Sequence, residues 1–242
     1  MSLITEKYDY KEIQKKSVEG KRLYACPDGN AVASVTTILD ATKDKTHLIA
    51  WRRRVGEAKA KEITTEASGV GTRMHKYLED YIADWPSWPT PGSNPYAQQA
   101  HKMASQIKEN VLDNHVTEIW GSEVQLYHPK IYAGTTDLVG TYDNVPAIMD
   151  FKQTNKPKQR EWIGDYFTQL AAYAMAHNHV YGTNIQSGII LMCSKDGFFQ
   201  KFEVFDKEFQ GYMHTFLKKV DQYYANCTKN PNDQDTKNDQ KV

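Results

Sequence analysis

The sequence of 242 residues predicts one α/β domain, with a central mixed β-sheet flanked by helices, an N-terminal hairpin and a helical elaboration. Short β-branched and aromatic segments separated by turn residues fill the middle of the chain, and segments of helical periodicity precede and follow them. The chain is 40% apolar and 12% aromatic, which is enough for a substantial core. Because no repeat, linker or shift in composition interrupts it, residues 1–227 are expected to form one domain, and the polar residues 228–242 a disordered tail.

The first predicted elements are a hairpin and three helices. Strands over 22–26 and 31–36 flank a Pro-Asp-Gly-Asn turn, a combination typical of hairpins. Helical spacing then predicts helices over residues 46–66, 71–84 and 96–113. Asn94 and Pro95 supply an N-cap and a first-turn proline for the last of these helices.

The periodicity then changes from helix to strand. A meander of three strands is predicted over residues 118–127, 131–142 and 145–151. The elements predicted after it are a helix over 161–177, strands over 186–193 and 198–205, and an amphipathic helix over 207–225. This order fits an α/β sandwich around a central mixed sheet.

Charge, hydropathy and cysteine content exclude several classes of protein. The 30 basic and 30 acidic side chains give zero net charge, which argues against a non-specific nucleic-acid coat protein. A nuclease is not excluded, since only a local basic strip has to face the phosphates. No apolar run approaches the length of a membrane span, and mean hydropathy is −0.69, so no membrane partner is expected. Three cysteines without a Cys-x-x-Cys pair predict neither a disulfide framework nor an Fe–S cluster.

The first twenty residues carry four lysines and four acidic side chains without an apolar run. They resemble neither a secretory signal nor an acid-poor transit peptide. The protein is therefore expected in the cytoplasm, which is that of the host if a phage encodes it.

A carboxylate and an ammonium group occur two residues apart at the end of a predicted strand. Because side chains alternate along a strand, Asp150 and Lys152 should point to one face and Phe151 to the other. Such a pair can hold a divalent cation and polarise a water molecule beside it. The alternative is an ordinary surface pair.

The preceding strand brings a second carboxylate. Asp137 interrupts an apolar segment, where a buried acid is costly unless it is paired or binds a cation. A short connection joins the two strands, so we expect Asp137 beside Asp150, with a hard cation relieving their repulsion. Alternatively, Asp137 faces water from an edge strand. Glu123, in the strand before, is a weaker candidate that could equally face solvent.

His75 is expected at the boundary between core and solvent. Its helix carries an apolar stripe formed by Met74, Tyr77, Leu78 and Tyr81. The side chain of His75 lies about 110° from the centre of that stripe. It can therefore be a metal ligand at the edge of a cleft, or a plain boundary histidine.

The helix after the Asp-x-Lys strand has two stripes. One consists of Trp162, Tyr166, Gln169 and Tyr173, and the other of Ile163, Phe167, Leu170 and Ala174. If the aliphatic stripe packs on the sheet, the first stripe is left for a partner with polar and π surface. The alternative is that both stripes belong to the core.

Two basic clusters complete the set of candidates. Four positive charges occur in nine residues without an acid, at Lys152, Lys156, Lys158 and Arg160. A second cluster is formed by Arg52, Arg53 and Arg54. Charge runs are often only solvated surface, but beside a metal site a phosphate backbone is the obvious anionic partner.

The order of these residues resembles that of a known nuclease superfamily. Asp137, Asp150-x-Lys152 and Gln169-x-x-x-Tyr173 are similar to the motifs of the PD-(D/E)xK nucleases, and the Gln-x-x-x-Tyr helix resembles the RecB-like branch. Gly71-Thr72-x-x-His75 matches the histidine motif of that branch. The segment 34–39, followed by Trp51, resembles the mitochondrial genome maintenance exonucleases and their phage relatives. The resemblance covers residues 22 to 180, and Thr136 stands where the superfamily pattern has proline.

The resemblance implies a restriction-endonuclease-like core and a role for each motif residue. It implies that Mg²⁺ or Mn²⁺ is ligated by His75, Asp137, Asp150 and the backbone carbonyl of Phe151. Lys152 would orient the attacking water and stabilise negative charge on the phosphoryl oxygens. Gln169 and Tyr173 would support the lysine or contact the nucleic acid.

Together these residues predict a metal-dependent DNA exonuclease that hydrolyses phosphodiester bonds at single-stranded or frayed ends. The expected setting is phage replication or recombination, with proteins of those processes as possible partners. Two alternatives stay open: a structure-specific endonuclease on the same fold, and a non-catalytic nucleic-acid-binding module. The apposed carboxylates argue against the second, since a pure binder of phosphate has no use for them.

Overall fold

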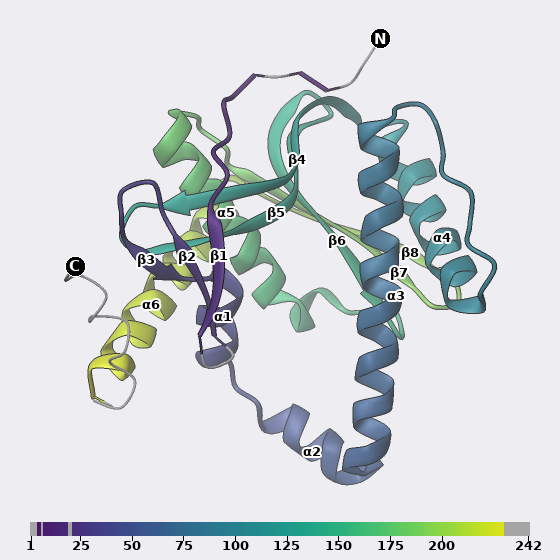
Figure 1. Ribbon diagram of the computed structural model, residues 1–242, viewed down its shortest axis with the longest axis horizontal. Helices are drawn as coiled ribbons and strands as arrows, with labels where there is room; N and C mark the ends of the chain where they lie inside the picture. The colour runs from purple at the N-terminus through teal and green to yellow at the C-terminus, as the bar shows by residue number, and fades with distance from the viewer. Residues whose placement is uncertain (1–3, 6, 19–20, 230–242) are drawn as a thin grey trace.

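The computed structural model describes residues 4–5, 7–18 and 21–229 of the chain, and it confirms the predicted α/β domain around a mixed sheet (Figure 1). Five strands form the sheet in the order β4-β5-β6-β7-β8. Their bounds are Val116–His128, Tyr132–Tyr142, Val145–Thr154, Ser187–Ser194 and Phe199–Phe205. Only β6 and β7 pair in parallel, because the connection between them crosses over through a helix.

Helices cover both faces of this sheet. The helices α3 and α4 (Glu57–Ala83 and Pro95–Ile107) share one apolar core with it, and a π-helical turn over Lys108–Leu112 extends α4. On the opposite face lie α1, α5 and α6, over Val35–Ala41, Gly164–Tyr181 and Asp206–Lys229. The sheet therefore separates two cores, and residues of β5 and β6 alternate between them. None of the helices in the described part of the chain has the length and hydropathy of a membrane span.

A second, three-stranded sheet is formed near the N-terminus. Its strands are β1, β2 and β3, over Gln14–Val18, Lys21–Ala25 and Ala31–Ala33. The hairpin of β2 and β3 was predicted, whereas the extension of its second strand to residue 36 was wrong. Ser34 accepts a hydrogen bond from the backbone N–H of Thr37 at 2.9 Å and caps α1, so the β-branched residues after it begin a helix.

The predicted break between the first two long helices lies at a different glycine. Helix α2, over Thr46–Val55, ends at Gly56, whose φ of 84° suits glycine, and α3 then runs unbroken through residues 67–70. Val70 and Met74 are fully buried in the core between α3 and the sheet. Burial of these side chains outweighs the low helix propensity of Gly69 and Gly71.

The predicted C-terminal elements agree with the structure except at their ends. Helix α5 begins at Gly164, because residues 160–162 form a separate 3₁₀ turn, and α6 continues to Lys229. Residues 228 and 229 therefore belong to a helix, and the rest of the predicted tail, 230–242, lies outside the described residues.

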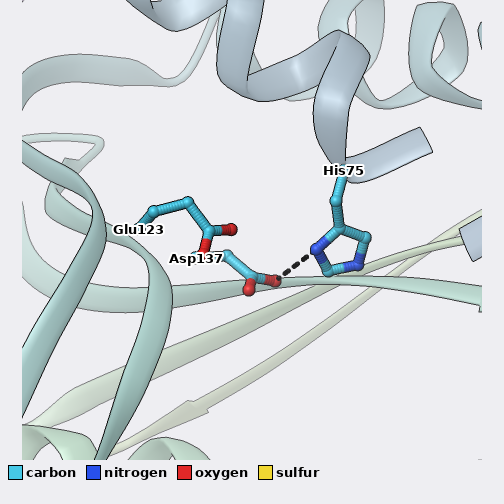
Figure 2. Close-up of side chains that lie close together, drawn as sticks. All are labelled: His75, Glu123 and Asp137. Atoms are coloured by element: carbon cyan, nitrogen blue, oxygen red, sulfur yellow. Dashed lines mark ion pairs between the residues drawn. The ribbon is translucent and has the colours of Figure 1, made fainter. Parts of the chain in front are cut away.

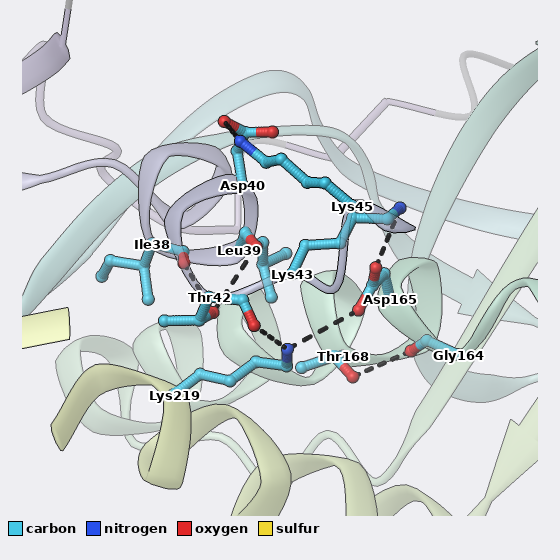
Figure 3. A network of polar contacts seen from close by, with 10 residues as sticks. All are labelled: Ile38, Leu39, Asp40, Thr42, Lys43, Lys45, Gly164, Asp165, Thr168 and Lys219. Carbon is cyan, nitrogen blue, oxygen red and sulfur yellow. Dashed lines mark hydrogen bonds and ion pairs between the residues drawn. The ribbon is translucent and has the colours of Figure 1, made fainter. Parts of the chain in front are cut away.

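A polar network holds the start of α5 against α1 and α6. Asp165 pairs with Lys43 at 3.0 Å and with Lys219 at 3.9 Å, and Lys219 also donates to the carbonyl of Thr42 at 3.4 Å (Figure 3). These contacts link three segments that lie far apart in the sequence. They fix the end of α5 that carries Tyr166, whose ring faces Lys152.

Candidate metal centre

The centre of the site is Asp137, at the point where β5 and β6 stop pairing. The antiparallel ladder between the two strands ends at Leu138 and Met149, so Asp137 and Asp150 are the next residues on each strand. Instead of a backbone oxygen, Oδ2 of Asp137 accepts the hydrogen bond from the N–H of Phe151, at 2.7 Å. The carboxylate therefore lies between the two strands, and only 9% of the residue is exposed. Asp137 and Asp150 therefore lie on adjacent strands at the same level, as the sequence predicts.

Asp150 and Lys152 point to the α5 side of β6, and Phe151 packs into the core under α3 and α4. The ammonium group of Lys152 forms an ion pair with Oδ2 of Asp150 and lies 5.2 Å from the ring centroid of Tyr166. Asp150 is only 2% exposed, and its Oδ2 accepts no hydrogen bond of ordinary geometry from the described residues. Asp150 and Lys152 thus form a buried ion pair.

Burial and charge act in opposite directions on these groups. Burial raises the pKa of Asp150 to about 6, although Lys152 opposes the shift. Burial would lower the pKa of Lys152, but Asp150 and Asp137 outweigh it and raise that pKa. Burial also disfavours ionised Asp137, but His75, Lys152 and the hydrogen bond from Phe151 outweigh it and lower its pKa. Asp137 therefore stays charged at neutral pH, while protons compete with any cation at Asp150 below about pH 6.

His75 reaches the same carboxylate from the other side of the sheet. It projects from α3, and its Nδ1 lies 3.5 Å from Oδ2 of Asp137. Its ring meets Phe151 edge-on at a centroid distance of 6.0 Å, which orients the imidazole. Burial lowers the pKa of His75, but the charge of Asp137, its hydrogen bond to the ring and the charge of Asp150 together outweigh burial, so the pKa lies above its ordinary value.

Glu123 completes a group of three side chains around this point. One ligand atom each of His75, Glu123 and Asp137 lies within 4.8 Å of the other two, and Figure 2 shows the three side chains converging. Glu123 is exposed as a residue, but burial of its carboxylate group raises its pKa to about 6. The charge of Asp137 adds to this shift. The predicted metal set is thus only partly assembled as one group, with Glu123 in it and Asp150 outside it.

The chemistry of these donors fits a divalent cation. Carboxylate oxygens suit Mg²⁺ and Mn²⁺, and an imidazole nitrogen adds a preference for a transition metal such as Mn²⁺. Added positive charge would lower the repulsion between the carboxylates of Glu123 and Asp137. It would also interact with Oδ2 of Asp150, which lacks an ordinary hydrogen bond. The residues present therefore fit the expected metal.

Gln169 and Tyr173 lie behind the ion pair, on α5. The amide of Gln169 donates to the hydroxyl oxygen of Tyr173 at 3.2 Å, and Tyr173 is 2% exposed. The tyrosine ring packs on Gly134 so closely that a Cβ there would lie 2.7 Å from a ring carbon. Burial raises the pKa of Tyr173, so its hydroxyl stays neutral. Within the described structure these two residues are placed to support the site rather than to lie on its surface.

The aromatic stripe predicted on this helix is divided by the structure. Trp162 belongs to the preceding 3₁₀ turn and is 64% exposed, whereas Tyr166 is partly buried beneath Lys152. The aliphatic stripe is fully buried at Phe167 and Leu170. Trp162 is therefore available to a partner without being part of the core.

The basic segment after β6 is also divided. Lys156 is exposed and Lys158 partly so, but Arg160 is engaged within the protein. Arg160 pairs with Glu208 at 2.8 Å and donates to the carbonyl of Glu203 at 2.9 Å. It can contact a phosphate only by leaving these partners, so the first two lysines are the better candidates for that role.

The chain is similar in sequence to known proteins over most of its length. No protein-family model matches the chain. It is 30% identical over 210 residues to mitochondrial genome maintenance exonuclease 1 of Xenopus tropicalis, covering 81% of this chain and 57% of that protein. The human protein of the same name is 28% identical over 183 residues, covering 69% of this chain and 51% of its own. A solved structure from Eubacterium rectale, 15% identical, aligns with 73% of this chain and 69% of that one at a TM-score of 0.49.

The chain spans little more than half the length of the curated relatives that it matches. The mouse protein of the same name gives a similar result, with 29% identity over 182 residues. This chain is therefore a homologue, over most of its own length, of proteins named mitochondrial genome maintenance exonuclease 1.

Proposed function

We propose that this protein is a metal-dependent DNA exonuclease that hydrolyses phosphodiester bonds at single-stranded or frayed ends, in replication or recombination. The observation that carries the proposal is the position of Asp137, which lies between His75 on α3 and the Asp150–Lys152 pair on β6. The homology to proteins named exonucleases supports the same reaction class. The proposal includes that the protein belongs to the RecB-like branch of the PD-(D/E)xK superfamily and that a phage encodes it.

The proposed metal ligands are His75, Asp137, Asp150 and the backbone carbonyl of Phe151. When bound there, Mg²⁺ or Mn²⁺ would polarise a phosphoryl oxygen and lower the pKa of an attacking water. The chain itself supplies the ordered carboxylates and the ring orientation of His75.

Lys152 has a separate role in the proposal. Its ammonium group is held by Asp150 and by the face of Tyr166, so it stays in place without a substrate. A fixed positive charge in a buried site stabilises the negative charge that develops on phosphoryl oxygens. Gln169 and Tyr173 hold α5 against the β5 strand behind this lysine.

An assay on end-labelled linear single-stranded DNA tests the proposal. We expect hydrolysis with Mg²⁺ or Mn²⁺ and none after metal removal with EDTA, because the carboxylates alone cannot activate water. Ca²⁺ should support binding better than cleavage, since its looser coordination positions water poorly. Undiminished cleavage by metal-free protein would contradict the proposal.

Replacement of Trp162 by Ala should weaken binding of single-stranded DNA by about 1–3 kcal/mol, which is typical for a stacked base. The melting temperature should not change, because Trp162 is 64% exposed. Binding is measured in Ca²⁺ by fluorescence anisotropy, alongside thermal unfolding. Tyr96→Ala, at a 51% exposed tyrosine at the start of α4, is the matched control and should bind like the wild type. Equal affinities of the two variants would exclude stacking on Trp162.

A further inference from the structure

The N-terminal sheet of β1, β2 and β3 is attached to the large sheet close to the metal centre (Figure 1). The hydroxyl group of Tyr24 on β2 lies 3.4 Å from Oγ1 of Thr135 on β5. Just before β1, the backbone N–H of Ile13 donates a hydrogen bond to the side-chain oxygen of Gln125 on β4. Gln125 and Thr135 are directly opposite each other in the ladder of β4 and β5. Both attachments therefore reach the same level of the large sheet.

This level lies two residues from two acids of the metal centre. Glu123 lies two residues before Gln125 on β4, and Asp137 lies two residues after Thr135 on β5. Two residues along a strand span about 6.6 Å. The N-terminal sheet therefore borders the metal centre.

Lys15, on β1, extends toward these acids. It is directly opposite Tyr24 in the ladder of β1 and β2, and the two residues of such a pair point to the same face. Tyr24 is 1% exposed and faces β5, so the side chain of Lys15 starts on the face that borders the large sheet. Its charge reaches the carboxyl group of Glu123, where it lowers the pKa against the burial that raises it.

The ammonium group of Lys15 is available to a ligand. Lys15 is exposed, and it forms no ion pair with another residue of the described chain. By contrast, Lys7 pairs with Glu118 at 3.7 Å, and Lys11 pairs with Asp9. The carboxylates of the metal centre repel a phosphate, which is also negatively charged. An unpaired lysine beside them offsets this repulsion and can bind the phosphate directly.

We infer that Lys15 binds a backbone phosphate of the nucleic-acid strand next to the scissile one, so that the N-terminal sheet forms one wall of the substrate path. The inference rests on the proposed function. It adds to that function a binding residue outside the segment 22–180, which resembles known nucleases. Because a phosphate contact carries no sequence information, Lys15 fixes the position of the strand whatever its sequence.

Binding of linear single-stranded DNA in Ca²⁺, measured by fluorescence anisotropy, tests the inference. Lys15→Ala should weaken binding about 10-fold, because it removes one hydrogen bond between charged groups. The slope of log Kd against log salt should become shallower by about 0.7, which is the contribution of one phosphate on a single strand. Lys16→Ala is the matched control, since Lys16 is exposed on the same strand but points to the opposite face. It should bind like the wild type.

A methylphosphonate linkage, which carries no charge, locates the phosphate that Lys15 binds. The linkage is placed at successive positions of the strand, and one position near the cleaved bond should weaken wild-type binding but leave the affinity of Lys15→Ala unchanged. Lys15→Arg should restore most of the affinity that Lys15→Ala loses, because a guanidinium group also binds phosphate. The melting temperature of each variant should equal that of the wild type, because Lys15 is exposed.

Equal affinities of Lys15→Ala and Lys16→Ala would overturn the inference. A loss of affinity that disappears in the background of Glu123→Gln would also overturn it, since Lys15 would then act only on that carboxylate. Hydrolysis is measured separately with Mg²⁺ or Mn²⁺. A protein that needs Lys15 for binding but cleaves no DNA would refute the proposed function and leave the inference intact. A nuclease that binds DNA equally well without Lys15 would refute the inference alone.

Discussion

Replacement of Lys152 by Met is expected to lower the rate of phosphodiester hydrolysis by about 10³-fold or more. The variant keeps most of the aliphatic length of the side chain and removes the ammonium group that lies over the Tyr166 ring and would stabilise the transition state. Asp150→Ala should lose a similar factor, because it removes both a proposed metal ligand and the partner that positions Lys152. Single-turnover rates at saturating enzyme measure the effect on the chemical step.

Lys152→Met should also destabilise the folded protein, and this effect must be separated from the loss of catalytic rate. Lys152→Met leaves Asp150 buried without its partner, and breaking a buried pair from one side costs about 3–5 kcal/mol of unfolding free energy. The double variant Asp150→Asn with Lys152→Met removes both charges, so it should regain most of that stability but no activity. Lys218→Ala, an exposed lysine on α6, serves as the unaffected control. A double variant that recovered both stability and turnover would contradict a catalytic role for the pair.

Alternation along strands explains why the central pair could be predicted from the sequence. The meander 118–151 has clear turns and regular side-chain alternation, so the common face of Asp150 and Lys152 follows from the strand period alone. The proximity of Asp137 to Asp150 follows from the short turn between β5 and β6. Neither depends on distant parts of the chain.

The register of the hairpin of β4 and β5 indicates the position of Glu123. Counting back from the turn between β4 and β5 pairs His128 with Tyr132 and, five residues further along each strand, Glu123 with Asp137. The register alone was not sufficient, because two bulges interrupt the far end of β4 and the conformation of Glu123 itself is irregular. The feature of the sequence that indicates this position is that Glu123 falls opposite Asp137 when the two strands are paired from the turn between them.

Long-range contacts explain the features that the sequence could not predict. Arg160 looked like a free phosphate ligand, but its partner Glu208 lies 48 residues further along the chain. The helix break at Gly56, rather than near residues 67–70, depends on burial of Val70 and Met74 against the sheet. In both cases tertiary packing decides between local alternatives that the sequence leaves nearly equal.

The topology of the substrate should strongly affect the rate of cleavage. Asp150 and Asp137 are only 2% and 9% exposed, so a scissile phosphate has to enter the protein to reach them. If the proposed site is correct, the strand has to reach a point flanked by His75 of α3 and by Lys152, whose ammonium group faces Tyr166 of α5. A flexible single strand led in from its end can do so, whereas a stiff duplex cannot unless its end frays.

We therefore expect rapid degradation of linear single-stranded DNA, weak action on blunt duplex and no action on closed single-stranded circles. Gel assays compare a circle with the same circle opened by one cut, so that sequence, length and base composition are matched. Opening the circle should restore degradation, and the Lys152→Met variant should leave every substrate intact, which excludes a contaminating nuclease. Because the proposed stacking on Trp162 is independent of base identity, linear strands of different sequence should be degraded at similar rates. Efficient linearisation of the closed circle would favour the endonuclease alternative, because a strand without an end would then have reached the recessed carboxylates.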